Sequence, residues 1–374
     1  MLGRLRDGSF HAARTGGAQV EPCQQNPQTA RVQAEPASVR GWREGMRICL
    51  VGHFSAAADN SGDLGTKQVG AQIAARVSER HETMQISIRD PFSWRRIRAF
   101  RPQIIHFVLS PSMSGLLAAR VLTLFCGSAK TVLSAPNPNL ASWRIGTLLR
   151  PDLVLVQSHE SESLFRRMGC DTRFLPNGVD VQRFVPVSGA TKAQLREKYG
   201  IARDRLVILH VGPLIKRRNV EFLAQIQNAE RQVIIIGRIP MDEQVHRALL
   251  AAGCMVLTEY VEHIEELYAL SDCYVFPTPP ANRGASIEMP LSVLEAMSCN
   301  LPVFTTRFGA LPRAFEEGKG LVFVDSDDDL RGQLHRVDNG SKPRTRDKVL
   351  PYGWDSVVGS LEGIYEEISR GTER

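Results

Sequence analysis

The sequence lacks the cysteine patterns of disulfide frameworks and zinc sites. Its seven cysteines are odd in number, scattered along the chain and never spaced as C-x-x-C. Neither a disulfide-stapled secreted domain nor a zinc site is therefore indicated, and a reducing cytosol is the natural compartment for this cysteine usage. No Ser-His-Asp arrangement is recognisable, so metal-assisted hydrolysis and triad hydrolysis are both disfavoured.

Long apolar runs are also missing. The most apolar region, residues 104–126, is interrupted by Ser110, Pro111, Gly115 and Arg120. No segment therefore approaches the roughly 18 apolar residues of a membrane-spanning helix, and the first residues lack the apolar core of a signal peptide. The sequence predicts a cytoplasmic protein, with peripheral contact at the inner face of the membrane as an open alternative.

Charge of one sign does not dominate. The formal net charge is +6, from 46 Lys and Arg against 40 Asp and Glu. This balance suits an anionic ligand or an anionic membrane surface, but it is too mild to indicate a nucleic-acid partner. A dinucleotide fingerprint is absent as well, because no GxGxxG follows the first apolar run.

What is present is a regular alternation of apolar runs with helical patterns. The 374 residues and 43% apolar content suffice for two domains with separate cores, and the alternation predicts parallel sheets with crossovers. His106, inside one run, is interpreted as a core histidine with satisfied hydrogen bonds. The expected strands are 48–51, 84–88, 104–109, 131–133 and 153–156 in the first half, and 206–211, 233–236, 255–257, 274–276, 303–305 and 321–324 in the second.

These runs divide the chain into segments. Residues 1–45 are rich in Gly, Gln, Ala, Pro and Arg without periodicity, so they are expected to be disordered or an extension upstream of a start near Met46. Two Rossmann-like α/β domains are expected at 46–185 and 186–353. The last segment, 354–374, carries apolar residues on one face and is expected to be a helix.

The most informative segment is Ser286–Thr306. Pro290 has the fixed φ of a first helical turn, and apolar residues recur behind it at the spacing of one buried face, so a helix is expected from about Pro290. Asn300 is its expected stop. The backbone N–H groups of Leu291 and Ser292 carry the positive end of the helix dipole and can face a phosphate.

Glu295 lies just over one turn into this helix. A carboxylate there can accept hydrogen bonds from two vicinal ribose hydroxyls, which is what nucleotide recognition requires. The plain alternative is a solvated helix glutamate, and the surrounding pattern favours the ribose.

The segment resembles the signature of retaining glycosyltransferases of family 4, which have the two-domain GT-B fold. In that family a glutamate, seven residues and a second glutamate in a Leu-Glu-Ala-Met context precede a proline-initiated strand, and residues 294–297 and 301–303 match the second half. The resemblance implies two Rossmann-like parallel-sheet domains that face a central cleft, with residues 354–374 crossing back to the first. It also places Met289, Pro290 and Leu291 at the donor.

The first half of the signature departs from the family. The position eight before Glu295 is Ile287, and the nearest carboxylate is Glu288, one place late. Either the loop before Pro290 is bulged so that Glu288 touches the donor sugar, or that role is vacant.

A second match follows the expected strand 206–211. By position, Arg218 corresponds to the lysine that the family uses on the leaving diphosphate, and its planar fork can grip two phosphate oxygens. Gly212 opens this turn, Pro213 replaces a common family arginine, and Lys216 is the expected substitute for that cation. A solvated loop is the alternative, but the end of a strand in an open α/β sheet favours a binding site.

Two further loops are assigned by looser likeness. Gly62 and Gly65 lead into a helical pattern, so their backbone can approach phosphate or acceptor, with a plain turn as the alternative. The loop with Tyr260 and Val261 corresponds to the one that contacts the nucleobase through backbone groups in the family, so the choice of base stays open.

One amphipathic segment bears on the acceptor. Trp94, Ile97 and Phe100 share a helical face and are flanked by the arginines at 95, 96, 98 and 101. Such a helix can rest on an anionic membrane that carries a lipid-linked acceptor. It can equally be a crossover helix whose apolar side packs on the sheet.

The resemblance implies a retaining, metal-independent glycosyltransferase of polysaccharide or cell-envelope biosynthesis, with no separate cofactor. It would move a sugar from a nucleotide sugar to a glycan or lipid-linked acceptor, and the enzyme would mainly stabilise charge on the departing diphosphate. Two alternatives stay open: a sugar-nucleotide 2-epimerase of GT-B shape, and a non-catalytic GT-B subunit. The second is supported by Ile287, Pro213 and Ala135, which all depart from expected site residues.

Overall fold

The computed structural model describes residues 45–52, 64–87, 93–108, 116–117, 119–121, 129–135, 150–237, 240–280, 288–335 and 342–370. The chain divides into a unit Met1–Arg43 and a unit Glu44–Arg374. The first unit lies outside the described residues, and so does nearly all of the predicted disordered or added segment 1–45. Gly62 and Ile287 also lie outside them.

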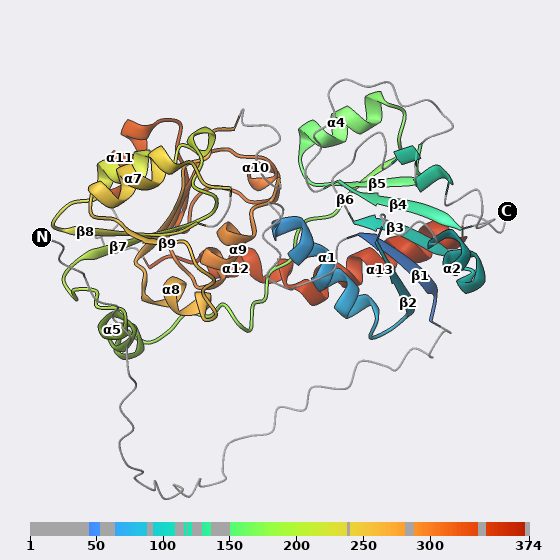
Figure 1. Cartoon of the computed structure of the whole chain (residues 1–374), viewed down its shortest axis with the longest axis horizontal. Coiled ribbons are helices and arrows are strands. Elements are labelled where there is room, and N and C mark those ends of the chain that lie inside the picture. Colours follow the sequence, from blue (N-terminus) through green and yellow to red (C-terminus); the bar gives the residue numbers. More distant parts are fainter. Residues whose placement is uncertain are drawn as a thin grey trace, which may run out of the picture. The chain divides into compact units, whose positions relative to one another are not determined.

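The first sheet has six parallel strands in the order β2-β1-β3-β4-β5-β6 (Figure 1). Its strands are β1 (Arg47–Gly52), β2 (Glu82–Ile86), β3 (Ile104–Val108), β4 (Lys130–Ser134), β5 (Leu153–Val156) and β6 (Thr172–Phe174), and the helices of this part are α1 (Leu64–Val77), α2 (Ser93–Phe100) and α4 (His159–Arg167). Five of these strands coincide with predicted runs, with β2 beginning two residues earlier than predicted. β6 was not predicted, because only three residues form it and Arg173 at its centre is exposed.

The second sheet is also six-stranded and parallel, in the order β12-β11-β10-β7-β8-β9. Its strands are β7 (Leu206–Val211), β8 (Arg231–Ile236), β9 (Met255–Leu257), β10 (Cys273–Phe276), β11 (Val303–Thr305) and β12 (Leu321–Phe323). The helices are α5 (Gly189–Lys198), η2 (Lys216–Arg218), α6 (Phe222–Ile226), α7 (Glu243–Ala251), α8 (Ile264–Leu270), α9 (Leu291–Ser298), α10 (Leu311–Ala314), α11 (Asp327–Leu334), α12 (Thr345–Val349), η3 (Leu350–Tyr352) and α13 (Trp354–Arg370). The two parallel sheets confirm the predicted α/β class.

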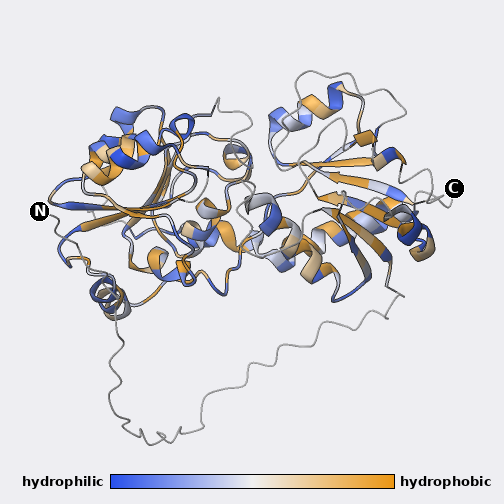
Figure 2. Cartoon of the chain, in the orientation of Figure 1, coloured by the Kyte–Doolittle hydropathy of each residue, from blue (hydrophilic) through white to orange (hydrophobic). Residues whose placement is uncertain are grey.

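Both sheets are covered on both faces, and this explains the continuous apolar runs. Alternate residues of a strand point to opposite faces. In β7, Val207 and Leu209 join one buried cluster, whereas Ile208 joins another on the opposite face. Figure 2 shows the strands of both sheets as hydrophobic along most of their length.

The last helix, α13, packs on the first sheet although it follows the second in the chain. Trp354 and Leu361 lie in the same buried cluster as Ile48 and Leu50 of β1. Gly178 permits this approach, because a Cβ there would lie 2.4 Å from the Trp354 ring.

His106 of β3 is a core histidine, as predicted. It is fully buried, with Nδ1 2.5 Å from the Tyr365 hydroxyl of α13 and Nε2 2.7 Å from the Ser134 hydroxyl. Burial lowers its pKa to about 3, so the ring is neutral and serves to join α13 to the sheet.

Each sheet has one point at which the strand order reverses. In the second sheet the chain runs from β7 through β8 to β9, and then returns to β10 on the other side of β7. Ligands of open α/β sheets bind beyond the carboxyl ends of the strands at such a point. The carboxyl ends of β7 and β10 are therefore the expected place for a ligand.

Candidate functional site

Arg218 lies at the carboxyl end of β7 and is only 7% exposed. A Cβ built on Gly212 would lie 2.9 Å from its Nη1, so the guanidinium lies directly against the backbone of Gly212 and a side chain there would have to displace it. Burial, aided by the charge of Arg217, lowers the pKa of Arg218 to about 10. The group is still charged at neutral pH, and a poorly hydrated cation at this position suits an anionic ligand.

His210, the fifth residue of β7, was not singled out from the sequence. It is fully buried, and its Nδ1 lies 2.9 Å from the carbonyl oxygen of Val275 in β10. Because a carbonyl can only accept, Nδ1 carries the proton. Burial lowers the pKa of the ring to about 4, and Nε2 has no hydrogen-bond partner among the described residues. The sequence signal that could have pointed to His210 is a polar residue inside an apolar run, two positions before Gly212.

Lys216 is not brought together with Arg218. Its side chain is exposed, and its Nζ donates to Gln244 Oε1 of α7 at 2.7 Å. The two predicted diphosphate cations therefore differ: Arg218 is buried at the strand end, and Lys216 is bound to a neighbouring helix.

The helix α9 begins at Leu291, one residue after the predicted start. Pro290 is its N-cap, with φ −63° and ψ 122°, and no side chain caps the helix. The carbonyl of Pro290 accepts from the N–H groups of Val293 and Leu294. The helix ends as predicted, with Asn300 following in the left-handed region at φ 59°.

Glu295 is buried within α9 and is 8% exposed. The hydroxyl of Tyr268 in α8 donates to its Oε2 at 2.7 Å. Burial raises the pKa of Glu295 to about 7, against the opposing effects of the Tyr268 hydrogen bond and the Arg183 charge. The solvated-glutamate alternative is therefore wrong, and the buried carboxyl group is a candidate for a functional site.

Glu288 binds the start of α4, 130 residues away in sequence. Its Oε1 accepts from the Ser158 hydroxyl at 2.6 Å, and its Oε2 accepts from the Ser158 backbone N–H at 3.1 Å and the Ser161 hydroxyl at 2.9 Å. Burial raises its pKa, and these hydrogen bonds oppose the rise. The carboxylate thus satisfies donors at a helix N-terminus, where a negative charge is favourable.

The residues between Glu288 and α9 also contact the first half of the chain. The Met289 side chain is fully buried, and its carbonyl accepts from Asn177 Nδ2 at 2.8 Å. Leu291 packs against the apolar cluster of the first sheet. These contacts fix the loop that leads into α9.

The other described residues of the predicted site, Gly65, Tyr260 and Val261, lie on other elements or loops. Gly65 lies in the first turn of α1. Tyr260 follows β9 with its side chain 69% exposed, and Val261 packs against the core of the second sheet.

The cationic helix α2 is a crossover helix with a covered apolar side. Ile97 is fully buried against the first sheet, and Trp94 packs beside it. The arginines at 95, 96, 98 and 101 are exposed. The apolar face of α2 is therefore covered by the first sheet, and only its cationic face is exposed. None of the helices in the described ranges is long and apolar enough to cross a membrane.

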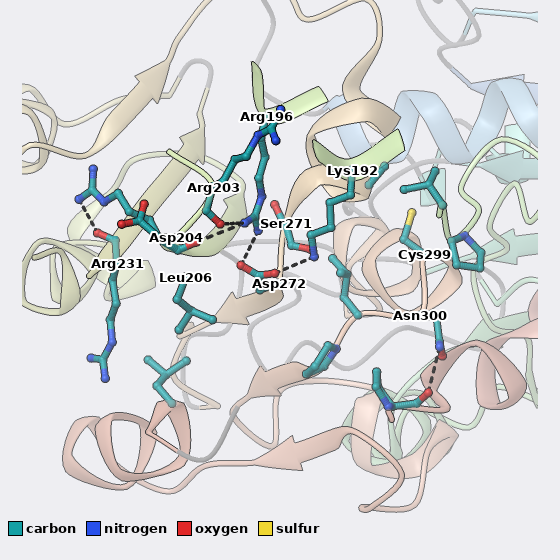
Figure 3. A pocket seen from close by; sticks show the side chains of 18 of the residues that line it. Lys192, Arg196, Arg203, Asp204, Leu206, Arg231, Ser271, Asp272, Cys299 and Asn300 are labelled. Carbon is teal, nitrogen blue, oxygen red and sulfur yellow. Dashed lines mark hydrogen bonds and ion pairs between the residues drawn. The ribbon is translucent and has the colours of Figure 1, made fainter. Parts of the chain in front are cut away.

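A cavity of about 800 Å³ opens at the other edge of the second sheet, at the amino ends of β7 and β8. Lys192 and Arg196 point at Asp272 there, as Figure 3 shows, and bind its two carboxylate oxygens. Arg196 also donates to the carbonyl of Leu270. These cations hold the sheet edge together, and the cavity is not where Arg218 and Glu295 lie.

Within the described ranges, no three His, Cys, Asp or Glu side chains gather in a way that could hold a metal ion. The expectation of a metal-independent site without a separate cofactor stays a prediction.

The fold is that of GT-B glycosyltransferases. The Anabaena protein HepE, solved in complex with UDP and glucose, superposes with a TM-score of 0.66 over 86% of this chain and 100% of that chain, at 15% identity. This likeness confirms the predicted GT-B architecture.

One part of the sequence matches a known family. Residues 205–337, which carry Arg218 and Glu295, match the family described as glycosyl transferases group 1. The match covers this part of the chain only, and it agrees with the resemblance drawn from the sequence.

Two curated relatives come from corynebacteria. A GDP-mannose-dependent monoacylated alpha-(1-6)-phosphatidylinositol monomannoside mannosyltransferase of Corynebacterium glutamicum is 26% identical over 246 residues, which is 58% of this chain and 64% of that protein. A D-inositol 3-phosphate glycosyltransferase of Corynebacterium jeikeium is 28% identical over 225 residues, which is 53% of this chain and 52% of that protein. The chain thus matches between half and two thirds of the length of these relatives.

Proposed function

We propose that the protein is a glycosyltransferase that moves a sugar from a nucleotide-sugar donor to a glycan or lipid-linked acceptor, with retention of configuration. The observation that carries the proposal is the group of Arg218, Gly212, Glu295 and the N-terminus of α9 at the reversal point of the second sheet. A buried cation and a helix N-terminus suit a diphosphate. A buried carboxylate beside them suits a ribose.

The reaction needs little proton transfer from the protein. The bond between the sugar C1 and the diphosphate oxygen breaks, and a bond from C1 to the acceptor oxygen forms on the same face. The departing phosphate oxygen takes the acceptor proton. Arg218 and the N–H groups of Leu291 and Ser292 stabilise the charge that develops on the diphosphate.

The names of relatives support the donor class. HepE was solved with UDP and glucose, and the mannosyltransferase relative is GDP-mannose-dependent. HepE was also solved with UDP-glucose, which like GDP-mannose is a sugar nucleotide and fits the charge of this site. An anionic membrane next to the α2 arginines would suit a lipid-linked acceptor.

Incubation with a panel of UDP- and GDP-sugars tests the function. We expect one donor to raise the melting temperature, since a ligand at about 100 times its Kd stabilises by about 2.7 kcal/mol. We expect that donor to release nucleoside diphosphate only when a glycan mixture or lipid extract is added. An epimerase would convert the sugar nucleotide without releasing nucleoside diphosphate, and a non-catalytic subunit would do neither.

Glu288 has a separate expected effect. Replacing Glu288 with alanine should lower kcat and leave nucleoside-diphosphate affinity unchanged, because a contact to the sugar matters when the glycosyl group moves. Glu160→Ala, which removes an exposed carboxylate from α4, is the matched control in the same turnover and calorimetry assays.

The Ser161→Ala variant shows how Glu288 acts. It removes one of the three hydrogen bonds that hold the Glu288 carboxylate. A loss of turnover equal to that of Glu288→Ala would mean that Glu288 acts by holding α4. Normal turnover in a folded Glu288→Ala variant would mean that Glu288 has no role in the reaction.

A further inference from the structure

A stack of three buried rings lies between the two ends of the candidate site. The Tyr268 and Tyr274 rings are stacked, with centroids 6.0 Å apart and an angle of 23° between their planes. His210 continues the stack, with its centroid 6.4 Å from that of Tyr274 and an angle of 20°. The three rings come from α8, β10 and β7 and are fully buried. The stack begins beside Arg218 and Gly212 and ends at Glu295.

Both tyrosine hydroxyls bind the first turns of α9. Tyr274 Oη donates to Ser292 Oγ at 2.7 Å, and Tyr268 Oη donates to Glu295 Oε2 at 2.7 Å. Ser292 and Glu295 are three residues apart, so they share one face of the helix. The rings therefore fix the position of the helix that offers its N-terminus to the diphosphate.

The Tyr268 hydrogen bond uses only one oxygen of Glu295. No described residue donates to Oε1, which leaves that oxygen for a ligand hydroxyl. Because the phenol is held in a ring stack, it also fixes the rotation of the carboxylate. Two vicinal hydroxyls require such a fixed acceptor.

We propose that Tyr268 is the positioning residue for Glu295 in nucleotide binding and sets the pH above which nucleoside diphosphates bind. The proposal rests on the proposed function, in which Glu295 accepts from the ribose. Tyr268 itself touches no ligand, because its hydroxyl is already bound to the carboxylate.

The pH dependence follows from the groups around Glu295. Facing it are Tyr268 of α8, Tyr274 of β10, Cys299 at the end of α9, and Arg183 before α5. Burial raises the pKa of both tyrosines and of Cys299 far above neutrality, so these three groups stay neutral. Glu295 is therefore the group in this set that titrates near pH 7.

The ionised carboxylate is the better acceptor for ribose hydroxyls. Affinity should therefore fall as pH falls through about 7. Tyr268→Phe keeps the ring and removes a hydrogen bond to the charged form, so the pKa of Glu295 rises further and the midpoint of binding moves up by about one pH unit. At pH 7.5 the ionised fraction falls about threefold, and at pH 9 it is nearly restored.

The experiment is calorimetry of UDP and GDP between pH 6 and 9. It compares wild type, Tyr268→Phe, Tyr274→Phe and Glu295→Gln, each checked for folding by its melting temperature. The terminal phosphate of the ligand titrates near pH 6 with every variant, so the shift between variants is the quantity read. Tyr274→Phe is the matched control, because it loses a hydroxyl bound to Ser292 while leaving Glu295 bonded.

We expect a raised midpoint in Tyr268→Phe, an unchanged midpoint in Tyr274→Phe, and only the titration of the ligand in Glu295→Gln. A folded Tyr268→Phe with the wild-type midpoint would overturn this inference and leave the proposed function standing. Glu295→Gln that binds like wild type across the whole range would instead overturn the ribose assignment. The infrared band of the Glu295 carboxyl group, recorded without nucleotide, tests the hydrogen bond from Tyr268 independently of ligand binding.

Discussion

Replacing Arg218 with alanine is expected to lower turnover by about 10²- to 10³-fold, the range seen when one preorganised donor to a developing anion is removed. Arg218 is charged at neutral pH although its pKa is lowered to about 10. Folding has already removed most of its hydration, since only 7% of the residue is exposed. Its charge therefore acts on the leaving diphosphate with little screening by water.

The neighbouring residues supply the controls for this prediction. Arg218→Lys keeps the charge but loses the planar fork, so we expect a loss of about tenfold. Arg217→Ala removes an exposed cation from the same turn and should change turnover by less than about twofold. Single-turnover rates separate the chemical step from donor binding. Normal turnover in a folded Arg218→Ala would contradict the assignment of this residue to the diphosphate.

Much of the fold was predictable from local patterns. Parallel strands covered on both faces are continuous apolar runs, so most of the predicted runs match observed strands within two residues. The strand β6 was not predicted, because its three residues include an exposed arginine and do not form an apolar run. The end of α9 before Asn300 was also predictable, because the left-handed conformation of that residue favours asparagine.

The site was only partly predictable, because its residues bind partners far away in sequence. Arg218 and Glu295 were predicted from their place in a motif, and the structure shows that both are buried. The contact of Glu288 with Ser158 spans 130 residues and has no local pattern. Tyr268 and His210 lie inside apolar segments and look like ordinary core residues until the fold stacks them beside α9.

Replacing Glu295 with glutamine is expected to weaken nucleotide binding and to stabilise the protein at high pH. The folded pKa of about 7 lies above the ordinary 4.5. Between these values the folded state keeps a proton that the unfolded state loses, so the free energy of unfolding falls as pH rises from 4.5 to 7. Above pH 7 the full cost of the buried charge is present, on the order of 3 kcal/mol.

Glutamine has no charge to bury, so the variant avoids this cost. Between pH 5 and pH 8 its stability relative to wild type should therefore increase by about 2 to 3 kcal/mol, as measured by urea unfolding at each pH. The buried amide must still find hydrogen-bond partners, and that requirement lowers its stability at every pH. Glu266→Gln in α8 is the control, because its stability relative to wild type should change with pH in the opposite direction. Hydrogen bonds from Lys198 and Tyr199 lower the pKa of that half-buried carboxyl, so its small contribution is lost as pH falls.

Nucleotide affinity, unlike stability, should fall in Glu295→Gln. At pH 8 the ribose loses an ionised acceptor, and we expect UDP or GDP to bind Glu295→Gln about 10- to 150-fold more weakly, which corresponds to the roughly 1.5 to 3 kcal/mol of a charge-assisted hydrogen bond. A variant that is more stable and binds less would mean that the protein retains a costly buried carboxylate for its ligand. If stability rises with no change in affinity, the carboxylate does not hold the ribose. If the stability difference does not vary with pH, Glu295 is not ionising near pH 7, and the reasoning from its burial is wrong.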